Sequence, residues 1–302
     1  MNDLQWFMNG KTKNLIILLL TFLSAFDIFI WRFILAGSVD VSPEIYFLDI
    51  GQGDSQLVVL PLVGSSGGTV KILIDGGPKG SRLGERLSEI MPFYDRYVDL
   101  VVLTHPQADH FAGLIDIFKH YKVGAFISNG VKGTAKSFQE LENAVSNSSA
   151  QKVVLLAGDS ISYKDYVFKF ISPKPEFFDL PDLNHGSLVI LLKAGTAGAL
   201  FTGDIGFKEE DYLLENYDID VDILKVAHHG SKYSSEEKFL AAVSPKISVI
   251  EVGKNSYGHP TDAALSRLVA AGSQIFRTDQ DGTIKLSIFG DKISVFQSKK
   301  SR

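Results

Sequence analysis

The sequence predicts a layered α/β fold, with helices outside a sheet core and one apolar helix ahead of it. Three observations support this prediction. Strand-like and helix-like hydrophobic periods mix along the chain, strand pairs occur near both ends, and a run of 21 mostly apolar residues lies near the N-terminus. We expect a cytoplasmic stub and an anchoring helix in residues 1–40, and one domain in residues 41–302.

The composition limits the chemistry of the protein. The chain has 302 residues, of which 45% are apolar and 22% are charged, as in ordinary globular proteins. Its net charge of -5 excludes a strongly basic nucleic-acid coat protein. Cysteine is absent, which excludes disulfides, thiolate zinc sites, iron–sulfur clusters and a cysteine nucleophile. Any bound metal must therefore be held by histidine, carboxylate and water.

The apolar run covers residues 15–35 and is interrupted only by Thr21, Ser24, Asp27 and Arg32. A helix of about 20 apolar residues crosses the hydrocarbon core of a bilayer. Lysines at positions 11 and 13 precede the run, and positively charged flanks tend to stay in the cytoplasm. We expect a single-pass signal anchor that places the domain outside the cytoplasm.

Two other interpretations of this run stay open. Small residues at positions 36–38 (AGS) resemble a signal-peptide cleavage site, which predicts a secreted domain instead. Asp27 would cost about 2.5–3.5 kcal/mol at the bilayer centre, which favours an ordinary buried helix. The Leu, Ile and Phe residues around Asp27 can offset that cost, so the anchor is the preferred interpretation.

The first elements of the domain are predicted from hydrophobic period. Short runs at 45–50, 56–60 and 70–74 predict strands, and the glycine-rich loop at 64–68 predicts a hairpin between the last two. The strand at 98–103 is almost wholly apolar, as burial on both faces requires. This part of the chain therefore predicts a sheet with at least one buried central strand.

Helices and further strands follow along the chain. Residues 111–120 place Leu114, Ile117 and Phe118 on one face of a helix. By the same criteria we expect helices at 83–91, 137–145, 208–214, 235–243 and 262–271, and strands at 125–128, 153–156, 166–171, 188–192, 199–202, 222–226, 247–252, 274–277, 283–288 and 292–296.

Polar clusters follow four of the expected strands. These clusters are THPQADH at 104–110, GD at 203–204, HHGS at 228–231 and YGHP at 257–260. Ligands in layered α/β folds collect outside the carboxyl ends of strands. Histidine and carboxylate side chains that converge from several strand ends are what a divalent metal requires.

Each cluster also has an ordinary interpretation. A single histidine after a strand is usually a surface loop residue, and Gly-Asp is common in turns. His105, Asp109 and His110 are less easily explained in that way, because three potential ligands lie within six residues at a strand-to-helix turn. If the clusters were only polar residues whose hydrogen bonds are satisfied within loop turns, the same pattern would have to occur at four strand ends by accident. In combination, the clusters predict a metal site.

At this point the sequence resembles the metallo-β-lactamase-fold hydrolases, and within them the extracytoplasmic hydrolase domain of ComEC-type competence DNA-uptake proteins. The resemblance spans roughly residues 44–289. The segments that carry it are FLDIGQGDS at 47–55, LIDGG at 73–77, LTHPQADHFAG at 103–113, NHGSLV at 184–189, FTGDI at 201–205, LKVAHHGS at 224–231, YGHP at 257–260, and RTD with DG at 277–282.

The resemblance implies an αββα sandwich with a metal site at one rim. It implies that Asp204 bridges two metals, that one of His228 and His229 is a ligand, and that His185 is a further ligand only if the loop around it follows the wider family. Asp75 would orient the metal loop from behind. The implied ligands are His105, Asp109, His110, His185, Asp204, His228 and His229, and the implied supporting residues are Asp49, Asp54, Asp75 and Gln107.

One position departs from the family pattern. The wider family has histidine two residues after the first ligand and the ComEC-like version has aspartate, whereas this chain has Gln107. A neutral amide oxygen is a weaker ligand than carboxylate or imidazole. We therefore expect one or two zinc or manganese ions, with the first of the two sites in doubt.

The implied activity is hydrolysis by a metal-activated water. Asp109 would hold or deprotonate the water, and His259 and Lys225 would neutralise a phosphoryl oxygen, with His259 protonating the leaving group. The expected substrate is a phosphodiester, with single-stranded DNA as one candidate, and the membrane is the only other partner we expect. The alternative is a metal-poor, non-catalytic binding module that keeps the fold, which Gln107 favours.

Overall fold

The structure is a computed structural model that describes residues 10–36, 42–62 and 68–299. Its contacts divide the chain into two compact units, Met1–Val41 with Pro61–Gly68, and Ser42–Leu60 with Thr69–Arg302. The expected domain boundary near residue 40, most of the cleavage site at 36–38 and most of the loop at 64–68 lie outside the described residues. These three expectations stay predictions.

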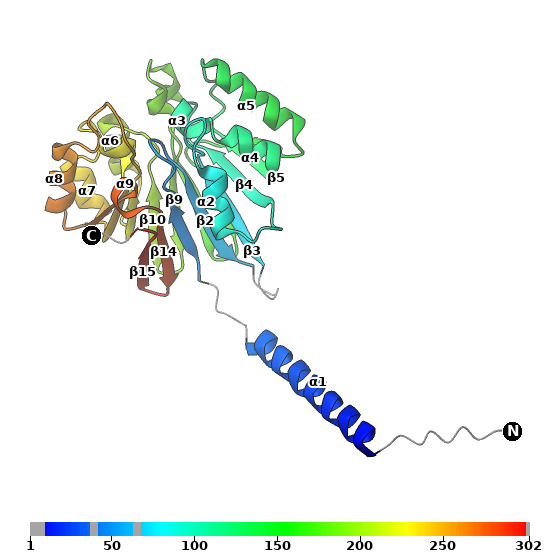
Figure 1. Cartoon of the computed structure of the whole chain (residues 1–302). Helices are drawn as coiled ribbons and strands as arrows, with labels where there is room; N and C mark the ends of the chain where they lie inside the picture. Colours follow the sequence, from blue (N-terminus) through cyan, green and yellow to red (C-terminus); the bar gives the residue numbers. More distant parts are fainter. Residues whose placement is uncertain (1–9, 37–41, 63–67, 300–302) are drawn as a thin grey trace. The chain divides into compact units, whose positions relative to one another are not determined.

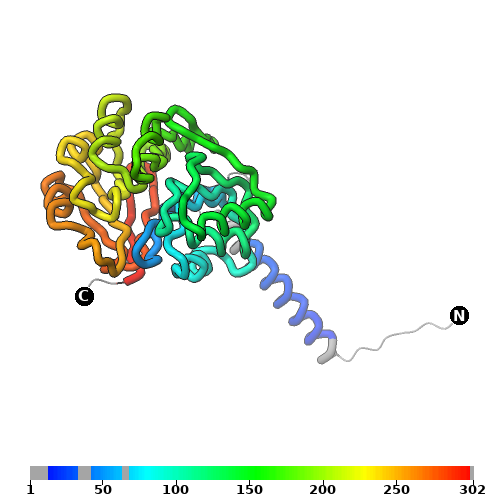
Figure 2. Tube along the Cα trace, turned by 90° about the horizontal axis from the view of Figure 1, so that it is seen from above, coloured from blue at the N-terminus to red at the C-terminus, as the bar shows by residue number. Residues whose placement is uncertain are grey.

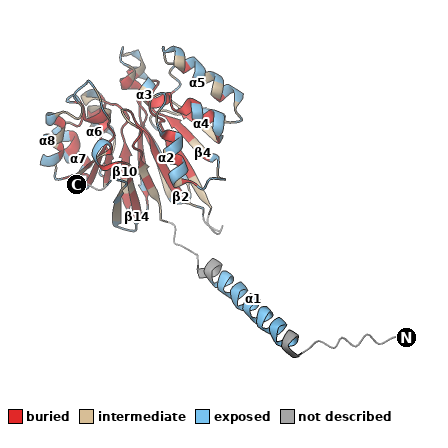
Figure 3. Ribbon diagram, in the orientation of Figure 1, coloured by how far each residue is buried: buried red, intermediate tan, exposed pale blue. Residues whose placement is uncertain are grey.

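The first unit holds a long apolar helix, α1 (Gly10–Ala36), drawn in blue in Figure 1. Its segment Lys13–Arg32 has 20 residues with a mean hydropathy of 2.1, and none of it is buried. Figure 3 shows the same helix as exposed along its described side chains. The helix α1 is therefore a candidate membrane span by length and composition, and the alternative of a helix buried in a protein core stays untested.

The described residues of the second unit form two sheets, one of which has eight strands. Its strands are β1 (Glu44–Phe47), β2 (Gln56–Pro61), β3 (Thr69–Ile74), β4 (Tyr97–Leu103), β5 (Lys122–Ser128), β6 (Gln151–Val154), β14 (Ile284–Phe289) and β15 (Lys292–Gln297). Their order is β15-β14-β1-β2-β3-β4-β5-β6. Strands β3 to β6 are parallel, and the C-terminal β14 returns to pair antiparallel with β1 (Figure 2).

The second sheet has seven strands among the described residues. They are β7 (Ser160–Tyr163), β8 (Tyr166–Ser172), β9 (Val189–Ala194), β10 (Ala197–Phe201), β11 (Ile223–Lys225), β12 (Ile247–Ile250) and β13 (Gln274–Arg277). Their order is β13-β12-β11-β10-β9-β8-β7. Strands β10 to β13 are parallel, and β7 to β10 pair antiparallel with one another in sequence order.

Helices cover the outer face of each sheet (Figure 1). One set comprises α2 (Leu83–Ile90), α3 (Ala108–Phe111), α4 (Leu114–His120) and α5 (Lys136–Asn147), and the other comprises α6 (Phe207–Asn216), α7 (Glu237–Val243) and α8 (Asp262–Ala270). The short helix α9 (Thr278–Asp281) follows β13, and three 3-10 turns are η1 (Pro175–Asp179), η2 (Leu183–Gly186) and η3 (Ala227–Gly230).

Three apolar cores hold these layers together. The central core lies between the two sheets, where Phe47 of β1 stacks on Phe201 of β10 with ring centroids 6.3 Å apart. One outer core joins the first sheet to α2–α5, and another joins the second sheet to α6–α8. The alternation of buried and exposed residues that this layering requires is visible in Figure 3. The predicted αββα sandwich is therefore confirmed.

The main difference from the expected elements lies behind the metal loop. The helix expected at 111–120 is broken into α3 and α4 at Gly113. The Gly113 amide donates to the Gly77 carbonyl at 2.9 Å, and a Cβ on Gly113 would lie 2.0 Å from the Gly76 carbonyl oxygen. Close packing of two backbone segments therefore ends α3, and only glycine fits there. The strand expected at 45–50 ends at Phe47, and α9 had not been predicted.

Topology brings the polar clusters to one rim of the sandwich. Asp75 and His105 follow the parallel strands β3 and β4 of one sheet, and Asp204, His229 and Glu251 follow the parallel strands β10, β11 and β12 of the other. Parallel strands end at a common edge, so side chains far apart in sequence meet there.

Candidate metal centre

The metal loop is organised by Asp75, a buried carboxylate behind it. Asp75 accepts hydrogen bonds from the Thr104 amide at 2.8 Å, the Thr104 hydroxyl at 2.7 Å and His110 Nδ1 at 2.8 Å. Its own backbone has a φ of 56°, a left-handed conformation that non-glycine residues rarely adopt. One carboxylate thus fixes both ends of the loop, which is the supporting role expected for Asp75.

His105 presents a lone pair that no protein group uses. The Thr104 hydroxyl donates to Asp75, so its oxygen accepts from His105 Nδ1 at 3.0 Å. Burial, reinforced by the nearby His110, lowers the pKa of His105 to about 3, so the ring is neutral. Its Nε2 is buried and has no hydrogen-bond partner among the described residues. A buried acceptor without a partner is costly unless a ligand occupies the space in front of it.

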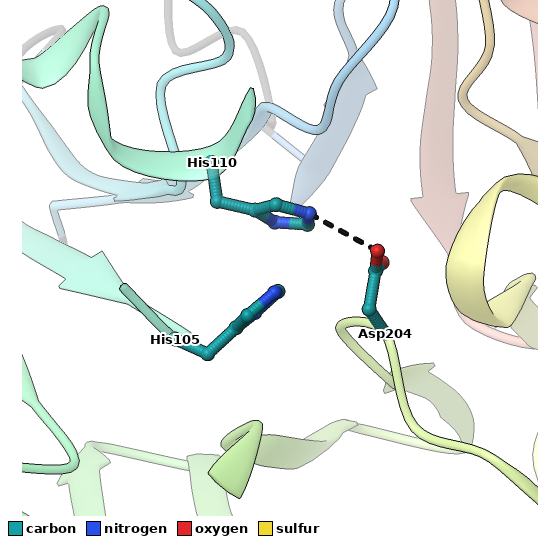
Figure 4. Close-up of side chains that lie close together, drawn as sticks. All are labelled: His105, His110 and Asp204. Atoms are coloured by element: carbon teal, nitrogen blue, oxygen red, sulfur yellow. Dashed lines mark ion pairs between the residues drawn. The ribbon is translucent and has the colours of Figure 1, made fainter. Parts of the chain in front are cut away.

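His110 and Asp204 complete this side of the centre. Asp204 is 1% exposed and follows β10. Its Oδ2 lies 3.3 Å from His110 Nε2, the contact marked by the dashed line in Figure 4. His105, His110 and Asp204 offer ligand atoms that all lie within 4.8 Å of one another. The loop after β4 and the loop after β10 are therefore close enough to share one ion.

The structure distinguishes the two histidines of the HHGS turn. His229 is buried, its Nδ1 donates to the Glu251 carbonyl at 2.8 Å, and its Nε2 lies 3.4 Å from Asp109 Oδ2 and 3.6 Å from Asp204 Oδ2. His228 is one-third exposed, and its Nε2 is 3.9 Å from Asp204 Oδ2. Both residues have left-handed backbones, with φ of 51° and 53°, which turns their rings in different directions. His229 is the better candidate ligand.

Charge accumulates in this buried cluster. Burial disfavours protonated His110 and His229, but the surrounding carboxylates outweigh it. The pKa of His229 is raised to about 10, chiefly by Asp204 and Asp54, and that of His110 is raised well above its usual range. The same contacts hold the pKa of Asp204 well below its usual range, although burial alone would raise it. The cluster is thus acidic enough to retain cations at neutral pH.

A second buried network lies directly beneath the centre. Lys225, 1% exposed, forms an ion pair with Asp54, donates to the Gly203 carbonyl at 2.8 Å and lies 3.6 Å from Asp204 Oδ1. Glu251 accepts from the Ser55 amide at 2.9 Å. Glu251 had not been predicted, although an acidic residue at the end of the apolar run 247–252 was a usable signal. Since Lys225 is buried, it does not reach substrate in the way we expected.

A cleft of about 410 Å³ opens onto the centre. Asp109, one-third exposed, lies at its floor, and hydrogen bonding to His229 and the nearby His110 keep the pKa of Asp109 low in spite of burial. His259 lines the wall, where burial and then His228 lower its pKa, so its ring is neutral at pH 7. A neutral ring carries no charge with which to neutralise a phosphoryl oxygen, but it can accept a proton. The expected role of His259 therefore changes from charge neutralisation to proton transfer. Lys79 and Tyr257 also line the cleft.

Three residues expected at the rim have other partners. His185 Nδ1 pairs with Glu209 Oε1 at 2.7 Å, and no candidate metal group among the described residues includes His185. Gln107 donates through its amide nitrogen to the Asn184 side chain. Asp49 forms ion pairs at 2.9 Å with Arg82 and with the lysine at position 299, away from the ligand cluster. Their assignment as ligands or supporting residues stays a prediction.

The donor set fits a divalent ion. Neutral His105, and His110 and His229 once deprotonated, direct Nε2 atoms at the same region as the Asp109 and Asp204 carboxylates. Each of these rings is oriented through Nδ1 by a neighbouring oxygen, the usual arrangement of metal-bound histidine. Imidazole and carboxylate without thiolate suit zinc, manganese or iron.

Metal binding should depend strongly on pH. In the metal-free protein, raised pKa values keep His110 and His229 protonated at pH 7, and both must lose a proton to act as ligands. The affinity for Zn²⁺ or Mn²⁺ should therefore rise between pH 6 and pH 8, by about tenfold per pH unit for each proton released. Titration calorimetry in buffers of different ionisation enthalpy measures both quantities. Affinity that is flat with pH, without proton release, would exclude these histidines as ligands.

The raised pKa values of these histidines also make the stability of the metal-free protein depend on pH. A histidine whose folded pKa is raised contributes stability that is complete below the unfolded value near 6.5 and is lost as pH rises through the folded value. For His229 this loss extends to about pH 10.

Comparison with known proteins bears on the whole domain. The family described as "Metallo-beta-lactamase superfamily" matches residues 51–253. The chain is 32% identical over 257 residues to ComE operon protein 3 of Bacillus subtilis (strain 168), covering 80% of this chain and 32% of that protein. It is 29% identical over 266 residues to Competence protein ComA of Neisseria gonorrhoeae, covering 84% and 35%. The chain thus spans about a third of the length of these relatives, and the expected resemblance is confirmed.

Solved structures agree at the level of the fold. YhfI from Bacillus subtilis, a metallo-beta-lactamase fold protein, aligns with a TM-score of 0.56 at 10% identity, covering 81% of this chain and 99% of that one. CmlA from Streptomyces venezuelae, a diiron beta-hydroxylase, aligns with a TM-score of 0.53 at 13% identity, covering 82% and 54%. At these identities the likeness concerns the fold alone.

Proposed function

The chain belongs to the metallo-β-lactamase superfamily, whose members are mostly metal-dependent hydrolases, and from this premise we propose that it is a phosphodiesterase. The observation that carries the proposal is the convergence of three imidazole Nε2 atoms and two carboxylates in one cluster, of which Asp109, Asp204 and His229 line an open cleft. A divalent cation in such a site supplies Lewis acidity and lowers the pKa of a water molecule toward about 7.

The chain's own residues define what happens around that cation. His105, His110, His229, Asp109 and Asp204 would hold it. Asp109 is ionised at neutral pH and partly open to the cleft, so it can accept a hydrogen bond from the attacking water and orient it.

The cleft wall contributes groups of a different kind. His259 is neutral, so it can accept the proton that the attacking water loses and donate that proton to the departing oxygen. Lys79, whose side chain is 77% exposed and paired with Glu140 only at 3.8 Å, can approach an anionic substrate at the cleft edge. An acidic protein needs such local positive charge to accept a phosphodiester.

The names of the relatives favour one class of substrate over others. One matched protein is named Competence protein ComA and another ComE operon protein 3. Recombination protein 2 of Haemophilus influenzae is 28% identical over 258 residues, covering 83% of this chain and 30% of that protein. These names support a nucleic-acid phosphodiester, with single-stranded DNA as the first candidate.

In this proposal, α1 determines on which side of the membrane the site lies. The helix would anchor the protein with the lysines at positions 11 and 13 in the cytoplasm, which places the domain outside. Intact cells that express the chain should then hydrolyse a substrate added to the medium. Activity that appears only after lysis would contradict this orientation.

A substrate panel tests the chemistry. We expect the metal-loaded full chain in detergent to hydrolyse a dinucleotide phosphodiester and to leave a phosphocholine ester and the β-lactam nitrocefin unchanged. We expect hydrolysis of the phosphodiester because Lys79 lines the cleft beside the donor cluster, where its charge can attract the anionic phosphate. Preferential hydrolysis of nitrocefin or the phosphocholine ester would refute a nucleic-acid phosphodiesterase while keeping a metal-dependent hydrolase.

One observation favours a second candidate, a non-catalytic binding module. Gln107 stands where the family has a stronger ligand, and its amide nitrogen is engaged with Asn184. Metal analysis of the purified protein separates the two. A protein that takes up neither manganese nor zinc when these are added would support the binding module and contradict the enzyme.

A further inference from the structure

We infer that Lys225 serves as a built-in cation on one oxygen of Asp204, and that it restricts the centre to a single divalent ion. The inference deepens the proposed metal site and rests on it. It concerns how many ions the centre takes, which is independent of the substrate.

Lys225 is held in a position that leaves its ammonium group no freedom. It is the last residue of β11 and is buried between the strand ends. It pairs with Asp54, donates to the Gly203 carbonyl at 2.8 Å and lies 3.6 Å from Asp204 Oδ1. The ion pair with Asp54 therefore fixes the group as an internal positive charge beside the centre.

The two oxygens of Asp204 consequently face different cations. Oδ2 lies 3.3 Å from His110 Nε2 and 3.6 Å from His229 Nε2, where the candidate ion would be held. Oδ1 faces the Lys225 ammonium. A carboxylate that bridges two metals needs both oxygens free for metal, so Lys225 takes the place that a second ion would use.

The candidate donor groups also overlap instead of forming two separate sets. Among the described residues, His110 belongs to three of the four groups, and the fourth joins Asp204 and His229 to Asp54, which is already paired with Lys225. Gln107, at the position where a second ion would need a strong ligand, has a neutral amide that is already bonded to Asn184. Too few donors remain for a separate second ion.

Charge balance leads to the same result. Lys225 compensates Asp54, which is completely buried and would otherwise be an unpaired carboxylate. A second dication beside the ammonium would place two positive groups against the same oxygen of Asp204 in a site shielded from water. Removing the ammonium would reverse the situation, because Asp54 and Asp204 would then offer two carboxylates to a new cation.

Metal counting tests this inference. The full chain in detergent is saturated with Mn²⁺ or Zn²⁺, desalted, and analysed for metal per polypeptide by plasma mass spectrometry, with calorimetric stoichiometry as a second readout. We expect one equivalent. Two equivalents would overturn the inference and leave the proposed function standing, whereas none would overturn the proposed function and the inference together.

A pair of lysine variants isolates the role of Lys225. Lys225→Met should raise the count to two equivalents. The matched control is Lys71→Met, because Lys71 is also a buried lysine, paired with Asp95 at 2.8 Å outside the ligand cluster. The control should stay at one equivalent. A folded Lys225→Met variant that still binds one equivalent would contradict the inference. If that variant fails to fold, the wild-type count decides by itself.

Discussion

Replacing Asp204 with asparagine is expected to lower kcat/KM for a phosphodiester by about 10³-fold, since metal-assisted charge stabilisation is worth several kcal/mol and each 1.4 kcal/mol is a factor of ten. Asp204 faces His110, His229 and Lys225 from one position, so the change removes the carboxylate that joins the two halves of the centre. Asparagine keeps the shape of the side chain. Steady-state kinetics and metal content of the same preparation measure the effect.

A matched variant shows whether the loss is specific. Asp222 is also a partly buried aspartate beside a strand, but its carboxylate pairs with Lys246 at 2.6 Å, and no candidate metal group among the described residues includes it. Asp222→Asn should keep kcat/KM within a few-fold of the wild type. Circular dichroism and the unfolding midpoint confirm that both variants are folded. A folded Asp204→Asn protein with normal turnover would end the metal-hydrolase account.

Replacing Phe201 with alanine is expected to destabilise the domain by about 3–5 kcal/mol, the usual cost of truncating a buried phenylalanine. Phe201 is 1% exposed and packs against Phe47 across the interface of the two sheets. The truncation leaves a cavity where the layers of the sandwich meet. Denaturant unfolding of the full chain, followed by circular dichroism, gives the change in free energy.

An exposed phenylalanine provides the comparison. Phe296 of β15 is 56% exposed, so Phe296→Ala should change the free energy of unfolding by less than about 0.5 kcal/mol. Equal effects at the two positions would contradict the packing of one sheet on the other.

Much of the fold could be predicted from the sequence, because apolar runs and the turns that follow them are local patterns. The apolar strand that becomes β4 could be identified from its own residues, and so could the turns that follow it. The polar clusters after β4, β10 and β11 were also identifiable, because polar residues interrupt apolar runs at the strand ends. The family resemblance then supplied the pairing of the two sheets, which no local pattern contains.

The points that sequence reasoning left open, and the expected role of Lys225, depend on contacts across long separations. The choice of His229 over His228 is made by two successive left-handed residues and by Glu251, 22 positions away. His185 turns toward Glu209 on α6. Lys225 looked available to substrate, but it is buried and paired with Asp54, which lies in the loop between β1 and β2. None of these partners is visible in a short motif.

The central claim is that imidazoles and carboxylates from both sheets hold one shared ion. The X-ray absorption spectrum of the zinc-loaded full chain tests it most directly, because imidazole ligands give a distinctive multiple-scattering pattern. The account predicts at least two imidazoles together with carboxylate oxygen, as the groups around His110 require. A spectrum with oxygen ligands alone would contradict it.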